Sequence, residues 1–187
     1  MPRYSALALL LPLSLMLSAC GEQYTASELY LAATPECKSW VEGSRFELPR
    51  GISVQATPPL ALKDGGVEIV LIYTLPRGTR ADFTALGFQL TQPHGAPIVN
   101  GKIVTIYQRG SESRPEIVDV VDQLPIRLAA VGNSADTQTR IRLQFPGQLP
   151  PRFDLQPPDL VIAEKRYPVR TYTYRYFGER NSYGMCR

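Results

Sequence analysis

Few side chains in this 187-residue chain belong to the types that carry out catalysis, and none are spaced as in a known active site. His94 is the only histidine, and it lies in a segment rich in Pro and Gly that predicts a turn. A histidine can act as a base, but a Ser-His-Asp site also needs an activated serine beside it. No Gly-x-Ser-x-Gly or Ser-x-x-Lys motif supplies such a nucleophile. Asp119 and Asp122 are three residues apart, so on a strand they would lie on opposite faces and would not share a metal ion. The sequence therefore predicts a protein that is not an enzyme and that uses no metal ion or cofactor.

The first twenty residues have the composition of a secretory signal peptide. Arg3 gives a positive start, residues 6–17 form an apolar core, and the small residues Ser18 and Ala19 follow. The core of about 12 residues is shorter than the roughly 20 that a membrane-spanning helix needs, and it contains Pro12. We therefore expect residues 1–20 to direct export rather than to span a membrane.

The end of this segment, Leu17-Ser18-Ala19-Cys20, resembles the lipobox of bacterial lipoproteins at all four positions. The resemblance implies that Cys20 becomes the first residue of the mature chain and carries a diacylglyceryl thioether and an acylated amine, with fatty acids such as palmitate. Several acyl chains give a stable membrane anchor. Because Gly21 is not Asp, the resemblance also implies sorting to the outer membrane of a Gram-negative bacterium, on its periplasmic face. The alternative is an ordinary secreted protein with an incidental cysteine near the cleavage point.

Two cysteines remain after the anchor, Cys37 and Cys186. An even pair in an oxidising compartment favours a disulfide, which would join the start of the domain to its end. The alternative is a pair of free buried thiols.

Length and charge restrict the partners. About 167 residues remain after the signal peptide, enough for one domain with a core. The formal net charge of +3 loses only Arg3 and becomes +2, which is too weak to predict nucleic-acid binding. The sequence leaves the oligomeric state open.

Hydrophobic periodicity predicts an all-β chain with little helix. Residues 21–36 read as a tether with one helical turn, and residues 37–187 as one β-sandwich, immunoglobulin- or transthyretin-like, of about eight short strands. Residues 67–75 have apolar side chains on both faces, as in a central strand. Residues 139–145 alternate between apolar and polar side chains, so Arg140 and Arg142 should point outward. Asn100-Gly101 predicts a hairpin turn, and residues 79–86 could form a short helix.

The C-terminal strand is the candidate binding surface. Tyr172, Tyr174 and Tyr176 would project from one face, with Arg170 beside them. Tyr and Arg dominate many protein interfaces, so this face could bind a partner. The alternative is a half-buried strand whose tyrosines cover the second sheet or the tether, with the arginines in solvent.

These observations predict a periplasm-facing lipoprotein of the outer membrane whose sandwich binds another protein. The protein would act either as an inhibitor or immunity-type protein against an envelope-attacking toxin, or as a structural part of an envelope assembly such as a secretion system. The alternative is a cell-wall- or glycan-binding module. An envelope hydrolase is the class that the sequence favours least.

Overall fold

The computed structural model describes residues 29–38, 44–63, 65–92, 97–110, 116–119, 127–130, 133 and 135–177. The predicted signal peptide with Cys20, the turn with His94, Asp122 and the predicted disulfide partner Cys186 lie outside these residues. Within the described residues no helix is long and apolar enough to cross a membrane.

The described backbone is almost entirely extended. Its fifteen strands are β1 (Leu29–Ala33), β2 (Arg45–Glu47), β3 (Ser53–Ala56), β4 (Leu60–Ala61), β5 (Val67–Pro76), β6 (Arg80–Phe83), β7 (Phe88–Thr91), β8 (Pro97–Gly110), β9 (Glu116–Asp119), β10 (Arg127–Ala129), β11 (Asp136–Phe145), β12 (Arg152–Gln156), β13 (Leu160–Ile162), β14 (Lys165–Tyr167) and β15 (Tyr172–Phe177). One short 3-10 turn, η1 (Pro49–Gly51), separates β2 from β3. The prediction of an all-β chain with little helix is confirmed, although the strands are more numerous than expected and three of them, β5, β8 and β11, are long.

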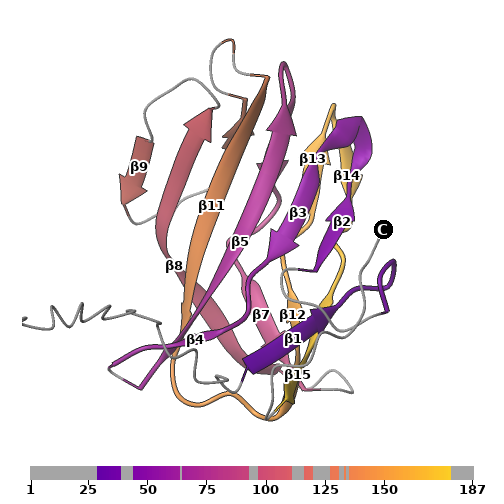
Figure 1. The fold of residues 1–187 in the computed structure, drawn as a ribbon. Helices are drawn as coiled ribbons and strands as arrows, with labels where there is room; N and C mark the ends of the chain where they lie inside the picture. Colours follow the sequence, from indigo (N-terminus) through magenta and orange to yellow (C-terminus); the bar gives the residue numbers. More distant parts are fainter. Residues whose placement is uncertain are drawn as a thin grey trace, which may run out of the picture.

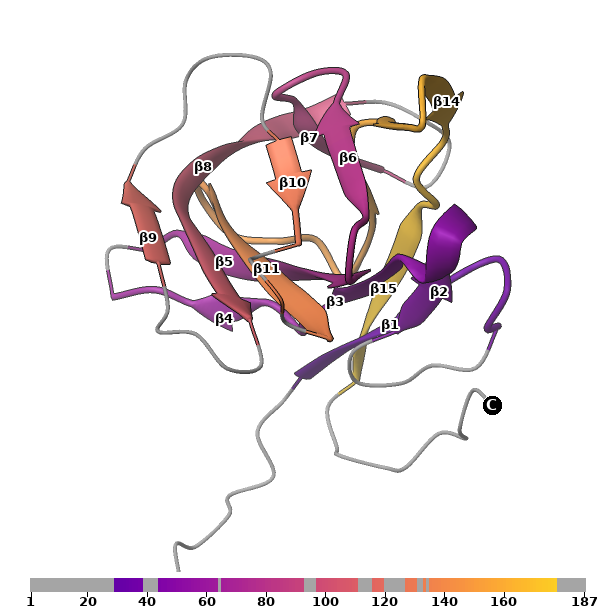
Figure 2. The same ribbon diagram turned by 90° about the horizontal axis from the view of Figure 1, so that it is seen from above.

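The strands form two antiparallel sheets that curl around one core. The larger, eleven-stranded sheet has the order β1-β15-β12-β7-β8-β11-β5-β3-β2, with β4 and β9 added beside β5 and β8. The smaller sheet has the order β10-β6-β13-β14. Figures 1 and 2 show the large sheet wrapping around until β1 and β15 lie near β2 and β3. The predicted sandwich is thus confirmed as a strongly curled one with some character of a barrel.

Ser44 joins the two ends of the large sheet. Its hydroxyl donates a hydrogen bond to the carbonyl of Ala32 in β1 (2.7 Å), and its carbonyl accepts one from the amide of Ala56 in β3 (3.2 Å). These bonds satisfy backbone groups that an open sheet edge would leave unpaired.

The two clearest strand predictions are confirmed. β5 pairs with β11, β3 and β4, and its buried residues include Ile69, Leu71, Tyr73 and Leu75. In β11 every second residue is buried, so Arg140 and Arg142 lie on the outer face of the sheet as predicted.

The predicted hairpin at Asn100-Gly101 is wrong. Both residues lie inside the continuous strand β8, where Asn100 pairs with Gln89 and Gly101 with Phe88 of β7. From Lys102 onward β8 pairs with β11 instead. A Cβ atom at position 101 would lie 2.5 Å from the Phe145 ring, so glycine is needed here for close packing rather than for a turn.

Two helical predictions are also wrong. The predicted tether ran to residue 36, with a helical turn continuing into Leu29-Tyr30-Leu31, but Leu29–Ala33 form β1 and pair with β15 along their whole length. Residues 79–86 contain β6, which pairs with both β10 and β13. In both places the hydrogen bonds of a neighbouring strand outweigh a weak local helical signal.

Candidate binding surface

Tyr172 and Tyr174 do not form a binding face, because both side chains have an exposed fraction of 0%. The ring of Tyr174 stacks on Phe153 at a centroid distance of 4.8 Å, and its hydroxyl donates a hydrogen bond to the carbonyl of Thr57 (2.8 Å). Tyr172 contacts the ring of Phe46 at 5.4 Å. Tyr172 and Tyr174 therefore pack within the domain, so their role is structural, as the alternative reading of this strand expected.

Burial also changes the chemistry of the tyrosines. It raises the pKa of Tyr73, Tyr172 and Tyr174 above the ordinary value of 10.0, and the pKa of Tyr172 is raised further by Tyr73, Tyr174 and Glu36 nearby. The buried hydroxyls of Tyr73 and Tyr172 have no hydrogen-bond partner among the described residues. These side chains therefore stay neutral and act as core residues.

The other two residues of the predicted face are held by contacts within the domain. The ring of Tyr176 packs on that of Tyr30 with a centroid distance of 5.3 Å. Arg170 precedes β15, and its Nε lies 2.7 Å from the Oε1 of Glu36. The structure thus does not bring Arg170 and the three tyrosines together on one open surface.

The outer faces of β5, β8 and β11 provide an open surface that the sequence did not group together. We call it the basic sheet face. Its side chains are exposed or half-buried and come from paired positions of the three strands, so they point to the same side. They are Val70, Ile72, Lys102, Thr105, Tyr107, Arg109, Gln138, Arg140 and Arg142.

Arg140 lies at the centre of this face. It is exposed, and its cross-strand neighbours are Tyr107 in β8 and Ile72 in β5. No ion pair or hydrogen bond joins its side chain to another described residue. An aromatic ring and an aliphatic side chain beside an unpaired guanidinium form the combination that recurs at the centre of protein interfaces.

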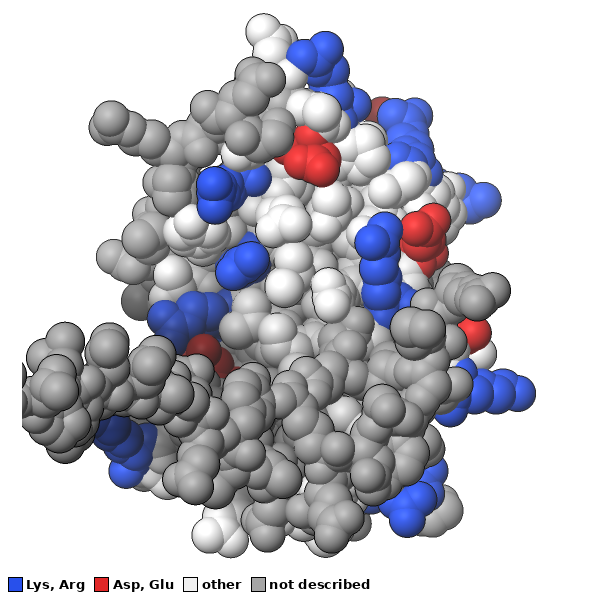
Figure 3. Space-filling view, viewed as in Figure 1, with Lys and Arg blue, Asp and Glu red and all other residues white. Residues whose placement is uncertain are grey.

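Only one of the basic side chains on the basic sheet face has an acidic partner among the described residues. Arg142 is held by Glu68, with Nη2 2.6 Å and Nε 3.1 Å from the same carboxylate oxygen. Asp136 begins β11 at the other end of the face. Lys102, Arg109 and Arg140 have no ion-pair partner among the described residues, and Figure 3 shows basic side chains spread over this side of the molecule with few acidic ones between them.

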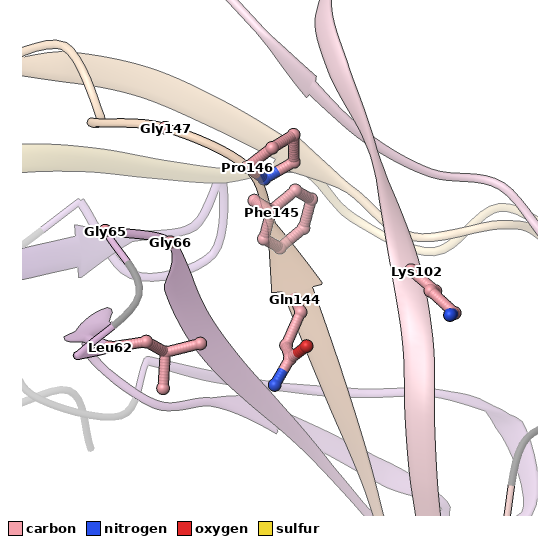
Figure 4. A pocket seen from close by; sticks show the side chains of 8 residues that line it. All are labelled: Leu62, Gly65, Gly66, Lys102, Gln144, Phe145, Pro146 and Gly147. Carbon is pink, nitrogen blue, oxygen red and sulfur yellow. The ribbon is translucent and has the colours of Figure 1, made fainter.

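A hollow of about 440 Å³ borders the lower end of this face. Figure 4 shows it between the β4–β5 hairpin, β8 and the end of β11, and its lining residues are Leu62, Gly65, Gly66, Lys102, Gln144, Phe145, Pro146 and Gly147. Leu60, opposite Glu68 on β5, is 63% exposed. The described residues that line the hollow are mostly glycines and apolar side chains, which suit the binding of an apolar side chain.

The described residues contain no group of three or more His, Cys, Asp or Glu side chains that could hold a metal ion. Cys37 is buried, and its backbone N–H donates a hydrogen bond to the Oγ1 of Thr34 (3.1 Å). Its predicted disulfide with Cys186 stays a prediction.

No protein-family model matches the chain, and no curated protein or solved structure shows significant similarity to it. The basic sheet face is therefore characterised by its own chemistry alone. Its one sequence signal was the outward alternation of Arg140 and Arg142. The sequence could not place Tyr107 and Arg109 beside them, because that neighbourhood depends on the pairing of β8 with β11.

Proposed function

We propose that this chain is a lipid-anchored protein of the bacterial envelope that binds another protein through the basic sheet face. The observation that carries the proposal is the open row of Ile72, Arg140 and Tyr107 on three adjacent strands. A partner that covered this row would bury aliphatic and aromatic area and would supply carboxylates for the unpaired arginines.

The proposed partner is a folded protein with an acidic surface around an apolar centre. Lys102, Arg109 and Arg140 would speed its approach and set its orientation, while Ile72 and Tyr107 would contribute burial. An apolar side chain of the partner could enter the hollow beside Leu62. Both proposed roles, an inhibitor or immunity-type protein and a structural part of an envelope assembly, use a surface of this kind.

Affinity capture tests the proposal. The mature chain carrying Cys20→Ser would serve as bait on envelope and secreted fractions, beside the Arg140→Glu variant and a Lys165→Glu control that makes the same charge change at an exposed position of β14. We expect one discrete partner that is lost with Arg140→Glu and kept with Lys165→Glu. A partner bound equally by all three baits would exclude the basic sheet face.

Two further measurements separate the alternatives. Sedimentation with purified peptidoglycan would reveal a wall-binding module, which would be retained without any protein partner. Fractionation of cells that express Cys20→Ser tests the anchor: we expect the protein to leave the membrane fraction, and continued membrane association would contradict the lipobox interpretation.

A further inference from the structure

The chain enters the folded domain only nine residues after the proposed lipidation site. Leu29 begins β1, and β1 is held along its length by β15. Nine residues span at most about 30 Å when fully extended. If Cys20 is lipidated, as the proposed function assumes, the start of β1 must therefore stay close to the bilayer surface.

An arginine pair lies beside this entry point. Arg175 in β15 is directly opposite Leu31 in β1 on one side and opposite Arg152 in β12 on the other. The β12 strand begins just after the loop that Tyr30 holds, because the Tyr30 hydroxyl donates to the carbonyls of Leu149 and Pro150 at 3.1 Å. In Figure 1, β1, β15 and the loop that enters β12 lie together at the bottom of the molecule. The arginines are thus at the end of the domain that the anchor holds near the membrane.

Arg152 and Arg175 have no acidic partner among the described residues of the domain. Both are exposed, and no ion pair joins either of them to a described residue. Like charges on directly opposed strand positions destabilise a sheet. The guanidinium of Arg175 lies over the ring of Phe177 at 5.3 Å, a contact that orients it without neutralising it. An anion bound between the two side chains would relieve the repulsion.

We propose that Arg152 and Arg175 contact the phosphates of anionic phospholipids in the membrane that carries the anchor. Guanidinium groups bind phosphate through paired hydrogen bonds. Residues 21–28 of the connecting segment contain Glu22 and Glu28 but no Lys or Arg, so this segment supplies no cation of its own to the bilayer surface. The contact would hold β1, β12 and β15 against the bilayer, and it would leave the basic sheet face open toward the periplasm.

Vesicle co-sedimentation tests this contact without the lipid anchor. The mature chain carrying Cys20→Ser, which keeps every described residue, would be mixed at low salt with vesicles of phosphatidylglycerol or of phosphatidylcholine. We expect binding to phosphatidylglycerol only, and weaker binding as salt screens the charges. Each basic residue near an anionic surface changes the partition by about fivefold, so Arg152→Glu with Arg175→Glu should lower it by about 25-fold or more.

The matched control is Arg109→Glu with Arg140→Glu, which makes the same charge change on the basic sheet face. The control should keep most of the vesicle binding, and both double variants should keep the urea midpoint of the parent chain. Equal losses in the two double variants, equal binding to phosphatidylcholine, or no binding by the parent chain would overturn the proposal. Partner capture and cell fractionation test the proposed function separately, so a failure of either is distinguishable from a failure here.

Discussion

The inner face of β15 and the outer face of β11 show how differently similar patterns can be used. Both strands alternate between two kinds of side chain, and both carry residue types that are common at interfaces. In β15 Tyr172 and Tyr174 point inward and are fully buried, whereas in β11 Arg140 and Arg142 point outward and stay accessible. A tyrosine ring can enter a core because its apolar area outweighs the cost of one hydroxyl, but a guanidinium cannot.

The largest expected effect tests this contrast directly. Tyr172→Ala and Tyr174→Ala should each lower the free energy of unfolding by about 3–5 kcal/mol, as expected for a large aromatic side chain removed from a packed core. Arg140→Ala should change it by no more than about 0.5 kcal/mol, because that side chain is exposed and unpaired. Urea denaturation measures all three. A stable Tyr174→Ala variant that had lost its partner would reverse the assignment of the two faces.

Alkaline pH should lower the stability of the folded chain through its buried tyrosines, which tests the same contrast. In the unfolded chain tyrosine loses its proton near pH 10, but burial raises the pKa of Tyr73, Tyr172 and Tyr174 in the folded chain. Above pH 10 the unfolded state therefore binds fewer protons, and stability falls as the pH rises. The loss should approach about 1.4 kcal/mol per buried tyrosine for each pH unit.

Urea midpoints at pH 9, 10 and 11 measure the alkaline loss, and absorbance at 295 nm reports tyrosine ionisation. Tyr73→Phe should reduce the slope, since it removes one of the buried groups. Complete and reversible ionisation of the native protein near pH 10, without unfolding, would contradict the burial of these tyrosines.

The two regions are joined by β8, and the close packing of Phe145 on Gly101 in this strand gives an effect of intermediate size. Gly101→Ala would place a Cβ atom 2.5 Å from Cε1 and 2.6 Å from Cζ of Phe145, whose ring is buried and has little room to move. We expect a loss of about 1–3 kcal/mol. Gly87→Ala is the matched control, because no atom lies within 4 Å of its added Cβ. Equal stability of the two variants would show that the strand does not depend on this close approach.

The sequence predicted the features of single strands better than it predicted which strands and residues lie side by side. Periodicity identified the central strand β5 and the outward arginines of β11, because these features depend on one strand alone. It could not show that Asn100-Gly101 lies within a strand, since a glycine that allows a turn and a glycine that allows close packing look the same in the sequence. The close approach of Phe145 is a contact between residues far apart in the chain.

The candidate surface depends even more on long-range pairing. The alternation of β15 correctly placed Tyr172 and Tyr174 on one face, but it could not show which face meets the core. That choice follows from the curl of a sheet in which β15 lies between β1 and β12. The basic sheet face likewise needs residues of β5, β8 and β11 side by side, and only the register of the strands provides this.

The smallest expected effect distinguishes the tyrosine hydroxyls from one another. Tyr174→Phe removes the hydrogen bond to the Thr57 carbonyl and should cost about 0.5–1.5 kcal/mol. Tyr73→Phe removes a buried hydroxyl that has no partner in the described part of the chain, so it should leave the stability unchanged or raise it. Urea midpoints of the two variants at neutral pH give the comparison, because each variant keeps its ring and loses only the hydroxyl oxygen. A loss of about 1 kcal/mol in Tyr73→Phe would show that this hydroxyl is satisfied in solution, for example by a buried water molecule, and that the interior is more polar than its protein contacts indicate.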